Sequence, residues 1–192
     1  MPADSLPSRT GTSRFAARRI NVIGTSAAGK TTLSGSLAEL LGVPHIELDA
    51  LHWEANWTEA SDEVMRKRVV AAIGADGWVV DGNYALVRDL VWARADAVVW
   101  LDLPLRTILW RYLGRTLRRI AGQQELWSGN RERLTTQLFT RDSLLWWILT
   151  TYRRRRRDYP RMLAARPDLL AVHLRSGREA DRWIATMARQ LR

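Results

Sequence analysis

A short stretch of the chain combines the residue types that bind phosphate groups. Residues 24–31 read Gly-Thr-Ser-Ala-Ala-Gly-Lys-Thr, which matches the P-loop pattern G-x-x-x-x-G-K-[ST]. Two glycines let the backbone wrap around an anion, so that N–H groups and a helix N-terminus point at the phosphates, and Lys30 adds a mobile positive charge. The sequence therefore predicts an ATP site formed by Gly24, Thr25, Ser26, Ala27, Ala28, Gly29, Lys30, Thr31 and Thr32.

Two acidic residues stand at positions where phosphate chemistry uses a carboxylate. Asp81 follows the apolar run 78–80, and P-loop proteins keep an acid for Mg²⁺ at such a strand end. We predict that Asp81 and the Thr31 hydroxyl serve the Mg²⁺ that arrives with ATP. Asp49 closes the run 45–48, and we predict that it orients or deprotonates an acceptor hydroxyl. For both carboxylates the alternative role is capping of a helix or loop.

Arginines at helical spacing predict a second contact with the phosphates. Arg111, Arg115, Arg118 and Arg119 lie at i, i+4, i+7 and i+8, which is one stripe of a helix. Guanidinium groups grip phosphate oxygens in pairs and stabilise the charge that moves during transfer. A purely solvated basic face is the alternative. The predicted catalytic residues are Lys30, Asp49, Arg111 and Arg115.

The elements that must position these residues alternate along the chain. Five short apolar runs are typical of strands buried on both faces of a parallel sheet, at 20–23, 45–48, 78–80, 97–101 and 170–174. Helical patterns lie at 30–41, 61–75, 105–120 and 178–191. The alternation predicts an α/β fold, a three-layer P-loop NTPase sandwich with a five-stranded parallel sheet. Residues 121–165 break the rhythm, and we predict an Arg-rich helical lid insertion there.

The charge of the chain is concentrated in its second half. The 192 residues include 30 Lys and Arg against 20 Asp and Glu, which gives a formal charge of +10. Residues 1–100 hold 10 basic and 12 acidic groups, whereas residues 101–192 hold 20 and 8. This excess predicts an anionic partner, and nonspecific binding of nucleic acid through the basic half is one candidate.

The composition sets the expected class and compartment. A hydrophobic fraction of 46% and the absence of Cys favour one globular domain without disulfides, at 20–192. Residues 1–19 lack the apolar core of a secretory signal, and we predict a flexible N-terminal tail. No apolar stretch approaches the roughly 20 residues that span a bilayer. We therefore expect a cytoplasmic protein with no membrane partner.

Five consecutive arginines at 153–157 invite a nucleic-acid interpretation. Successive helical residues turn by about 100°, so the five encircle the helix instead of forming one face. Arg153 and Arg157 share a face, which we predict approaches the nucleotide while the others are solvated or contact a polyanion. No RNA-binding motif or zinc finger supports base readout, so any such binding would be driven by the backbone and sensitive to salt.

The P-loop, the Asp-Gly turn at 81–82 and the R-x-x-G-R spacing of residues 111–115 together resemble adenylate-kinase-like P-loop kinases. Residues 19–185 further resemble the bacterial topology modulation proteins. The segments that carry this resemblance are the P-loop, Leu-Asp-Ala-Leu-His-Trp at 48–53, Asp-Gly-Asn-Tyr at 81–84 and the Arg-rich C-terminal third. The resemblance implies that Arg111 lies against the adenine or ribose and that Arg115 reaches the ATP phosphates.

The stretch expected to bind the acceptor departs from adenylate kinases. Residues 44–65 carry six acidic residues and no Lys or Arg. Ala85 stands where the resemblance implies an arginine, and Arg88 could replace that arginine only by reaching back. Because an acidic pocket repels a phosphorylated acceptor, we expect an unphosphorylated or weakly charged one. Trp53 and Trp57 are candidates for stacking on it, with packing as the alternative.

The sequence as a whole predicts a Mg²⁺- and ATP-dependent phosphotransferase that acts on an unidentified small-molecule acceptor. The alternative is an ATP-gated, nucleic-acid-associated protein with weak or no kinase activity. A third candidate is a nucleotide-binding protein with only residual hydrolysis.

Overall fold

The computed structural model describes residues 16–121, 127–129 and 144–191. Its centre is a five-stranded parallel sheet with the strand order β2-β3-β1-β4-β5. The strands are β1 (Arg19–Gly24), β2 (His45–Glu47), β3 (Trp78–Asp81), β4 (Ala97–Leu101) and β5 (Leu170–Leu174). The predicted parallel sheet of five strands is therefore confirmed.

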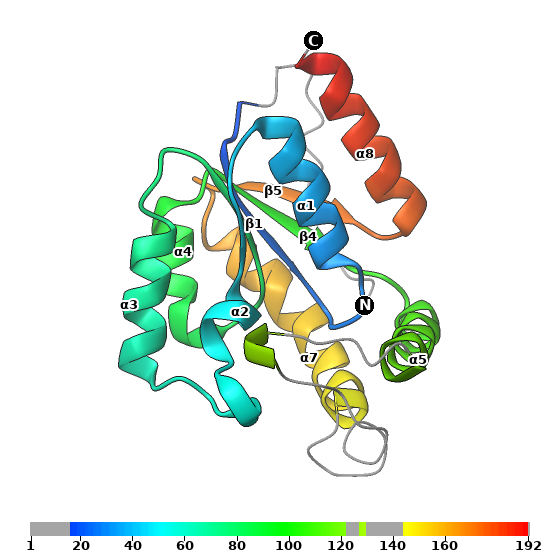
Figure 1. Ribbon diagram of the computed structural model, residues 1–192. Coiled ribbons are helices and arrows are strands. Elements are labelled where there is room, and N and C mark those ends of the chain that lie inside the picture. Colours follow the sequence, from blue (N-terminus) through cyan, green and yellow to red (C-terminus); the bar gives the residue numbers. More distant parts are fainter. Residues whose placement is uncertain (1–15, 122–126, 130–143, 192) are drawn as a thin grey trace.

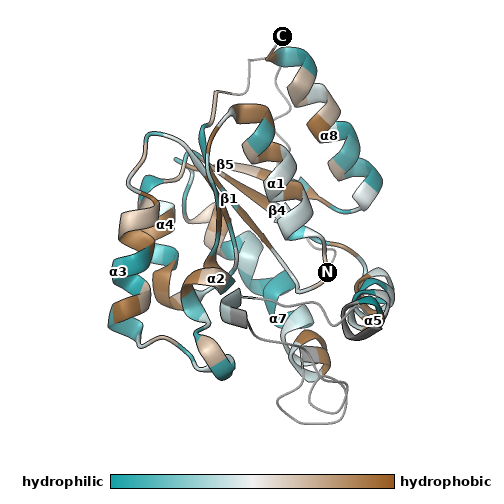
Figure 2. Cartoon of the chain, in the orientation of Figure 1, coloured by the Kyte–Doolittle hydropathy of each residue, from teal (hydrophilic) through white to brown (hydrophobic). Residues whose placement is uncertain are grey.

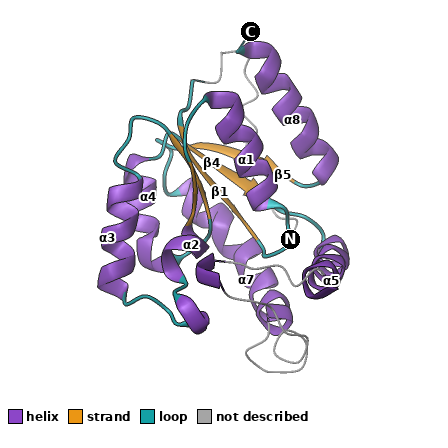
Figure 3. Cartoon of the chain, in the orientation of Figure 1, coloured by secondary structure: helices purple, strands orange, loops and turns teal. Residues whose placement is uncertain are grey.

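Helices cover both faces of this sheet (Figure 1, Figure 3). The α-helices are α1 (Lys30–Leu41), α2 (Leu48–His52), α3 (Asp62–Ala72), α4 (Arg88–Arg94), α5 (Leu105–Ala121), α7 (Leu144–Ala164) and α8 (Gly177–Gln190). Short 3₁₀ turns are η1 (Ala55–Trp57), η2 (Ala85–Val87) and η3 (Trp127–Gly129). Helices α1 and α8 lie on one face of the sheet, and α3 and α4 lie on the other.

Two hydrophobic cores fill the spaces between the three layers. Successive residues of a strand point to opposite faces, so Val99 and Leu101 of β4 enter one core while Val98 and Trp100 enter the other. Helix α7 contributes to both cores, because Tyr152 packs in the first and its later residues pack in the second. The strands appear as mostly apolar segments in Figure 2, as expected for a sheet covered on both sides. The three-layer prediction is confirmed.

Local sequence signals account for several helix ends. Gly42 adopts φ 62°, and its backbone N–H caps the end of α1. Ser61 and Ser176 cap the starts of α3 and α8, where their hydroxyls accept hydrogen bonds from the N–H groups of Val64 and Glu179.

Three boundaries differ from the predictions. Strand β2 ends at Glu47, and Asp49 lies in the short helix α2 instead of ending the strand. The folded domain begins before residue 20, because Ala17 is buried and the backbone N–H groups of Arg18 and Arg19 donate to Asp96. Much of the proposed lid insertion at 121–165 lies outside the described residues, and its described part is mainly the long helix α7.

Candidate active site

The P-loop connects β1 to α1 as its sequence predicts. Gly29, with φ 101°, precedes the first residue of α1, Lys30. No side chain caps this helix start, and its first turn holds no acidic residue. The first N–H groups of α1 are therefore available to an anion, and the positive end of the helix dipole favours one. A phosphate group is the ligand that this arrangement suits.

Asn83 fixes the first residue of the P-loop from the neighbouring strand. Its side-chain Oδ1 accepts a hydrogen bond from the Gly24 N–H at 2.9 Å, and its Nδ2 donates to the Gly24 carbonyl. A Cβ atom on Gly24 would lie 2.6 Å from the Leu101 carbonyl oxygen, so only glycine fits here. Asn83 thus ties the turn after β3 to the base of the loop. Nothing local in the sequence indicates this partner of Asn83, which is 59 residues away.

Thr31 and Asp81 lie together, as predicted for a metal pair. The Thr31 hydroxyl donates to Asp81 Oδ2 at 2.5 Å, and Asp81 is only 6% exposed. A hydroxyl and a carboxylate are hard oxygen donors that suit Mg²⁺, which commonly takes its other ligands from phosphates and water. The described residues contain no cluster of three or more His, Cys, Asp or Glu side chains that would hold a metal alone. The pair therefore fits a Mg²⁺ that arrives with a nucleotide.

The arginines of α5 reach the loop. Arg111 Nη1 donates to the Ala28 carbonyl oxygen at 2.7 Å. Its guanidinium lies so close to two glycines that a Cβ on Gly29 or on Gly177 would stand 3.1 or 2.8 Å from it. Arg115 and Arg118 line the same cleft, whereas the side chain of Arg119 is outside the described ones. The predicted stripe therefore contacts the P-loop at Arg111 and lines the cleft at Arg115 and Arg118.

A cleft of about 2000 Å³ brings the predicted groups together. We call the lining from the P-loop, α1 and α5 the P-loop wall, which includes Ser26, Ala27, Ala28, Gly29, Lys30, Thr31, Thr32, Arg111, Arg115 and Arg118. We call the lining from the other segments the second wall, which includes Glu47, Asp49, His52, Trp53, Trp57, Glu59, Asp62, Tyr84, Arg88, Trp127, Arg154 and Arg155. Gly24 and Thr25 are buried at the base of the loop and do not line the cleft.

Asp49 is held on the second wall by a tyrosine that sequence reasoning missed. The Tyr84 hydroxyl donates to Asp49 Oδ1 at 2.6 Å. Burial, followed by the nearby Asp49 carboxylate, raises the pKa of Tyr84 far above its usual value, so the phenol stays protonated and keeps donating. Glycine is required at position 82 in this turn, since φ is 142° there and a Cβ would lie 2.8 Å from Leu48 Cβ. The turn after β3 therefore positions the predicted acid.

Aromatic rings surround this acid. Trp53 and Trp57 meet edge to face with centroids 5.5 Å apart, and His52 lies against both Trp53 and Tyr84. Trp127 Nε1 donates to Glu47 Oε2 at 3.3 Å. Both predicted tryptophans line the cleft and also pack on one another, so the part of the wall around Asp49 combines aromatic rings with carboxylates.

The arginines of the run 153–157 that line the cleft are not the two that we predicted. Arg154 and Arg155 line the cleft, whereas the exposed Arg153 and Arg157 do not. Arg157 instead pairs with Asp158 at 2.9 Å. The expectation that Arg153 and Arg157 approach the nucleotide was therefore wrong. Helix α7 packs against both cores, with Tyr152 in one and Tyr159 in the other. The helix is therefore rotated so that the middle of the run, at Arg155, points toward the protein interior.

Comparison with known proteins identifies the fold. No protein-family model and no curated protein matches the chain. Shikimate kinase from Bacteroides thetaiotaomicron matches with a TM-score of 0.53 and 18% identity, over 92% of this chain and 99% of that one. Shikimate kinase from Aquifex aeolicus gives 0.53 and 13%, over 90% and 95%. Shikimate kinase from Acinetobacter baumannii gives 0.52 and 18%, over 90% and 91%.

At these identities the likeness shows the fold alone, which is the α/β fold of P-loop kinases. The closer resemblance to topology modulation proteins gains no support from these matches, and neither does the nucleic-acid alternative, so both stay predictions. Within the described ranges, no helix is long and apolar enough to cross a membrane.

Proposed function

We propose that the chain is a phosphotransferase that moves the γ-phosphoryl group of ATP to a hydroxyl of a small acceptor. The observation that carries this proposal is the shared cleft, which has an uncapped P-loop helix on one wall and the Tyr84–Asp49 pair on the other. A cleft that only bound nucleotide would have no need for a carboxylate held in place in the same cleft as its phosphate site. Two walls of this kind suit a donor and an acceptor.

The P-loop wall binds and orients the donor. Backbone N–H groups at the start of α1 and the ammonium of Lys30 hold the β- and γ-phosphates. Arg111 and Arg115 add planar donors for the charge that spreads over the transferring group. Thr31 and Asp81 would hold Mg²⁺, which when bound neutralises phosphate charge. These groups act mainly by positioning and by electrostatic stabilisation.

The second wall supplies the proton acceptor. As the acceptor oxygen forms its bond to the γ-phosphorus, the bond between that phosphorus and the β–γ bridging oxygen breaks, and ADP leaves with the electron pair. The acceptor hydroxyl gives its proton to Asp49, which Tyr84 keeps in a fixed orientation through the 2.6 Å hydrogen bond. Because Tyr84 occupies Oδ1 of Asp49, Oδ2 is the oxygen that takes the proton.

The two lysines of the chain provide a matched test of nucleotide binding. Lys30 opens α1 at the loop, whereas Lys67 is exposed on α3 and pairs with Glu63 at 2.6 Å. Lys30→Ala should weaken binding of Mg-ATP by about 100-fold or more, because it removes a charge-assisted contact to phosphate. Lys67→Ala should leave the affinity unchanged. Titration calorimetry measures both affinities, and far-UV circular dichroism checks that both variants fold.

Equal affinities for Lys30→Ala and the unaltered protein would refute the proposed function. So would the absence of any heat when Mg-ATP is added to the unaltered protein.

A further inference from the structure

Arg155 occupies a position on α7 where the helix otherwise buries apolar rings. The buried stripe of this helix includes Ile148, Tyr152, Tyr159 and Leu163. Arg155 falls three residues after Tyr152 and four before Tyr159, which places it on the same face of the helix. Apolar residues normally fill such a stripe. A guanidinium in the middle of it needs a separate explanation.

Among the described residues, no carboxylate pairs with the guanidinium of Arg155. Its Nη1 atom is buried and makes no hydrogen bond. The group stands 5.6 Å from the ring of Trp147, in a cation–π contact. Burial lowers the pKa of Arg155, and the nearby Arg154 and Arg88 lower it further. Because burying an unpaired charge is costly, a residue kept in this state is typical of a site that a ligand completes.

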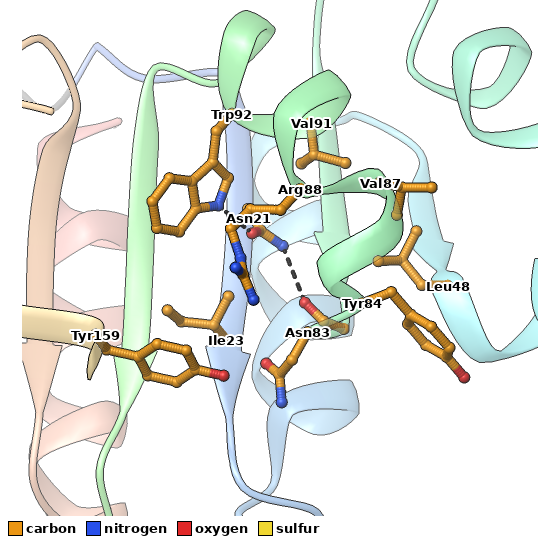
Figure 4. Close-up of a pocket in the computed structure, with 11 residues that line it drawn as sticks. Asn21, Ile23, Leu48, Asn83, Tyr84, Val87, Arg88, Val91, Trp92 and Tyr159 are labelled. Carbon is orange, nitrogen blue, oxygen red and sulfur yellow. Dashed lines mark hydrogen bonds between the residues drawn. The ribbon is translucent and has the colours of Figure 1, made fainter. Parts of the chain in front are cut away.

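Two more arginines lie near Arg155, one on another helix and one next to it on α7. Arg88, the first residue of α4, lies 5.8 Å from the ring of Trp92 and lines both the cleft and a small cavity beside it. Figure 4 shows Arg88, Trp92 and Tyr159 around that cavity. Arg154 lines the cleft next to Arg155. No ion pair within the described part of the chain joins any of these three arginines to a carboxylate.

Two other arginines of the run, Arg156 and Arg157, each pair with a carboxylate. Arg156 Nε lies 3.0 Å from Asp102 Oδ1, and Arg157 Nε lies 2.9 Å from Asp158 Oδ1. The polar side chains on the inner side of the small cavity already have hydrogen-bond partners. Trp92 Nε1 donates to Asn21 Oδ1 at 2.9 Å, and Asn21 Nδ2 donates to the Val80 carbonyl. Within the described part of the chain, the arginines of the run that line the cleft without an ion pair are therefore Arg154 and Arg155.

We propose that Arg88, Arg154 and Arg155 form the subsite for an anionic group of the acceptor, which is a small hydroxyl compound bearing a carboxylate or a phosphate. This inference rests on the proposed function. The anionic group binds between α4 and α7, and the hydroxyl lies at Asp49. Guanidinium groups match the planar geometry of carboxylate and phosphate oxygens, so three of them select an acceptor by charge.

This subsite bears on the expectation of an unphosphorylated or weakly charged acceptor, which a carboxylate would meet and a phosphate would not. That expectation came from the acidic stretch 44–65, but two of its acids are neutralised by their own partners. Glu54 pairs with Arg68 at 2.8 Å, and Glu63 pairs with Lys67 at 2.6 Å. The arginines that attract the acceptor come from α4 and α7, outside the stretch, so its composition did not reveal them.

Three probes with one carbon frame test the charge of the acceptor. Glycerol, glycerate and glycerol 3-phosphate all carry hydroxyl groups but differ in having no anion, a carboxylate or a phosphate. Each is titrated into protein saturated with Mg²⁺ and a non-hydrolysable ATP analogue, so that the P-loop is already filled. Binding is followed by calorimetry and by the fluorescence of tryptophan, since Trp92 and Trp147 contact the arginines. At least one anionic probe should bind about tenfold or more tightly than glycerol, and the better of the two identifies the group.

Variants of the run assign the effect to residues. Arg155→Gln should weaken binding of that anionic probe by about tenfold or more, whereas Arg153→Gln, an exposed neighbour outside the cleft, should change nothing. Arg88→Gln tests the same subsite from another helix and must weaken binding as well. Circular dichroism confirms folding of each variant.

Three outcomes would overturn the subsite. The first is that neither anion binds better than glycerol, and the second is that Arg155→Gln and Arg153→Gln behave alike. The third is tight binding of duplex DNA that is lost in Arg155→Gln, which would assign the arginines to a nucleic-acid backbone. In each case normal affinity for Mg-ATP would leave the proposed function standing, whereas loss of nucleotide binding in the unaltered protein would refute that function separately.

Discussion

The P-loop wall and the second wall of the cleft are built in different ways. The P-loop wall comes largely from one contiguous segment, whose base is fixed by Asn83 and whose rim is contacted by Arg111. The second wall is assembled from α2, the turn after β3, α4, η3 and α7, which are far apart in the sequence. A wall made from one segment binds the same group, here phosphate, in any protein that contains the segment. A wall made from several segments binds a different ligand when the residues of any one segment are replaced.

Asp49→Asn is expected to have the largest effect and to separate the two walls. An amide cannot take the acceptor proton, so kcat of phosphoryl transfer should fall by about 10²- to 10⁴-fold. Affinity for Mg-ATP should be unchanged, because Asp49 lies on the second wall. Steady-state kinetics and calorimetry give the two numbers, and Asp76→Asn, in an exposed turn, is the matched control. An equal loss in nucleotide affinity would show that the walls do not act separately.

Asn83→Ala should have the next largest effect, on the P-loop wall. The substitution leaves the N–H and carbonyl of Gly24 without their side-chain partner. We expect the free energy of unfolding to fall by about 1–3 kcal/mol. Mg-ATP binding should also weaken, because the base of the loop is no longer held. Urea unfolding with and without nucleotide measures both changes. A variant as stable as the unaltered protein, with full affinity, would contradict this role.

Asp96 lies outside both walls, so its substitution should change stability by a smaller amount and leave the cleft unaltered. Burial alone would raise the pKa of Asp96, but hydrogen bonds from Arg19 and from the N–H groups of Arg19 and Arg18 leave it below the usual value. A lowered folded-state pKa contributes stability that is present above about pH 4 and is lost as the pH falls through the folded value.

Asp96→Asn should therefore lower the free energy of unfolding by about 1 kcal/mol at pH 7, since the pair is partly exposed. This gap should close below about pH 4. Urea unfolding across the acid range measures it. A difference in the free energy of unfolding that grew as the pH fell would contradict a lowered pKa of Asp96 in the folded protein.

The comparison of the walls also explains what the sequence could predict. The P-loop, Thr31 with Asp81, and all five strands follow from short local patterns, and the structure places them as expected. Asp49 was identified by type and neighbourhood but lies in α2, because the chain turns into a helix directly after Glu47. Tyr84 gave no local signal, because its partner Asp49 is 35 residues away. Arg155 was seen only as a member of the run 153–157, because its burial and its nearness to Arg88 of α4 appear only in the packed fold.

Transfer of label from γ-phosphate-labelled ATP tests the central claim most directly. The protein is incubated with Mg²⁺, labelled ATP and a pool of small hydroxyl compounds, and the products are separated from inorganic phosphate. Our account predicts a labelled organic phosphate with the unaltered protein and none with Lys30→Ala. Label found only in inorganic phosphate, or at equal levels with both proteins, would contradict it.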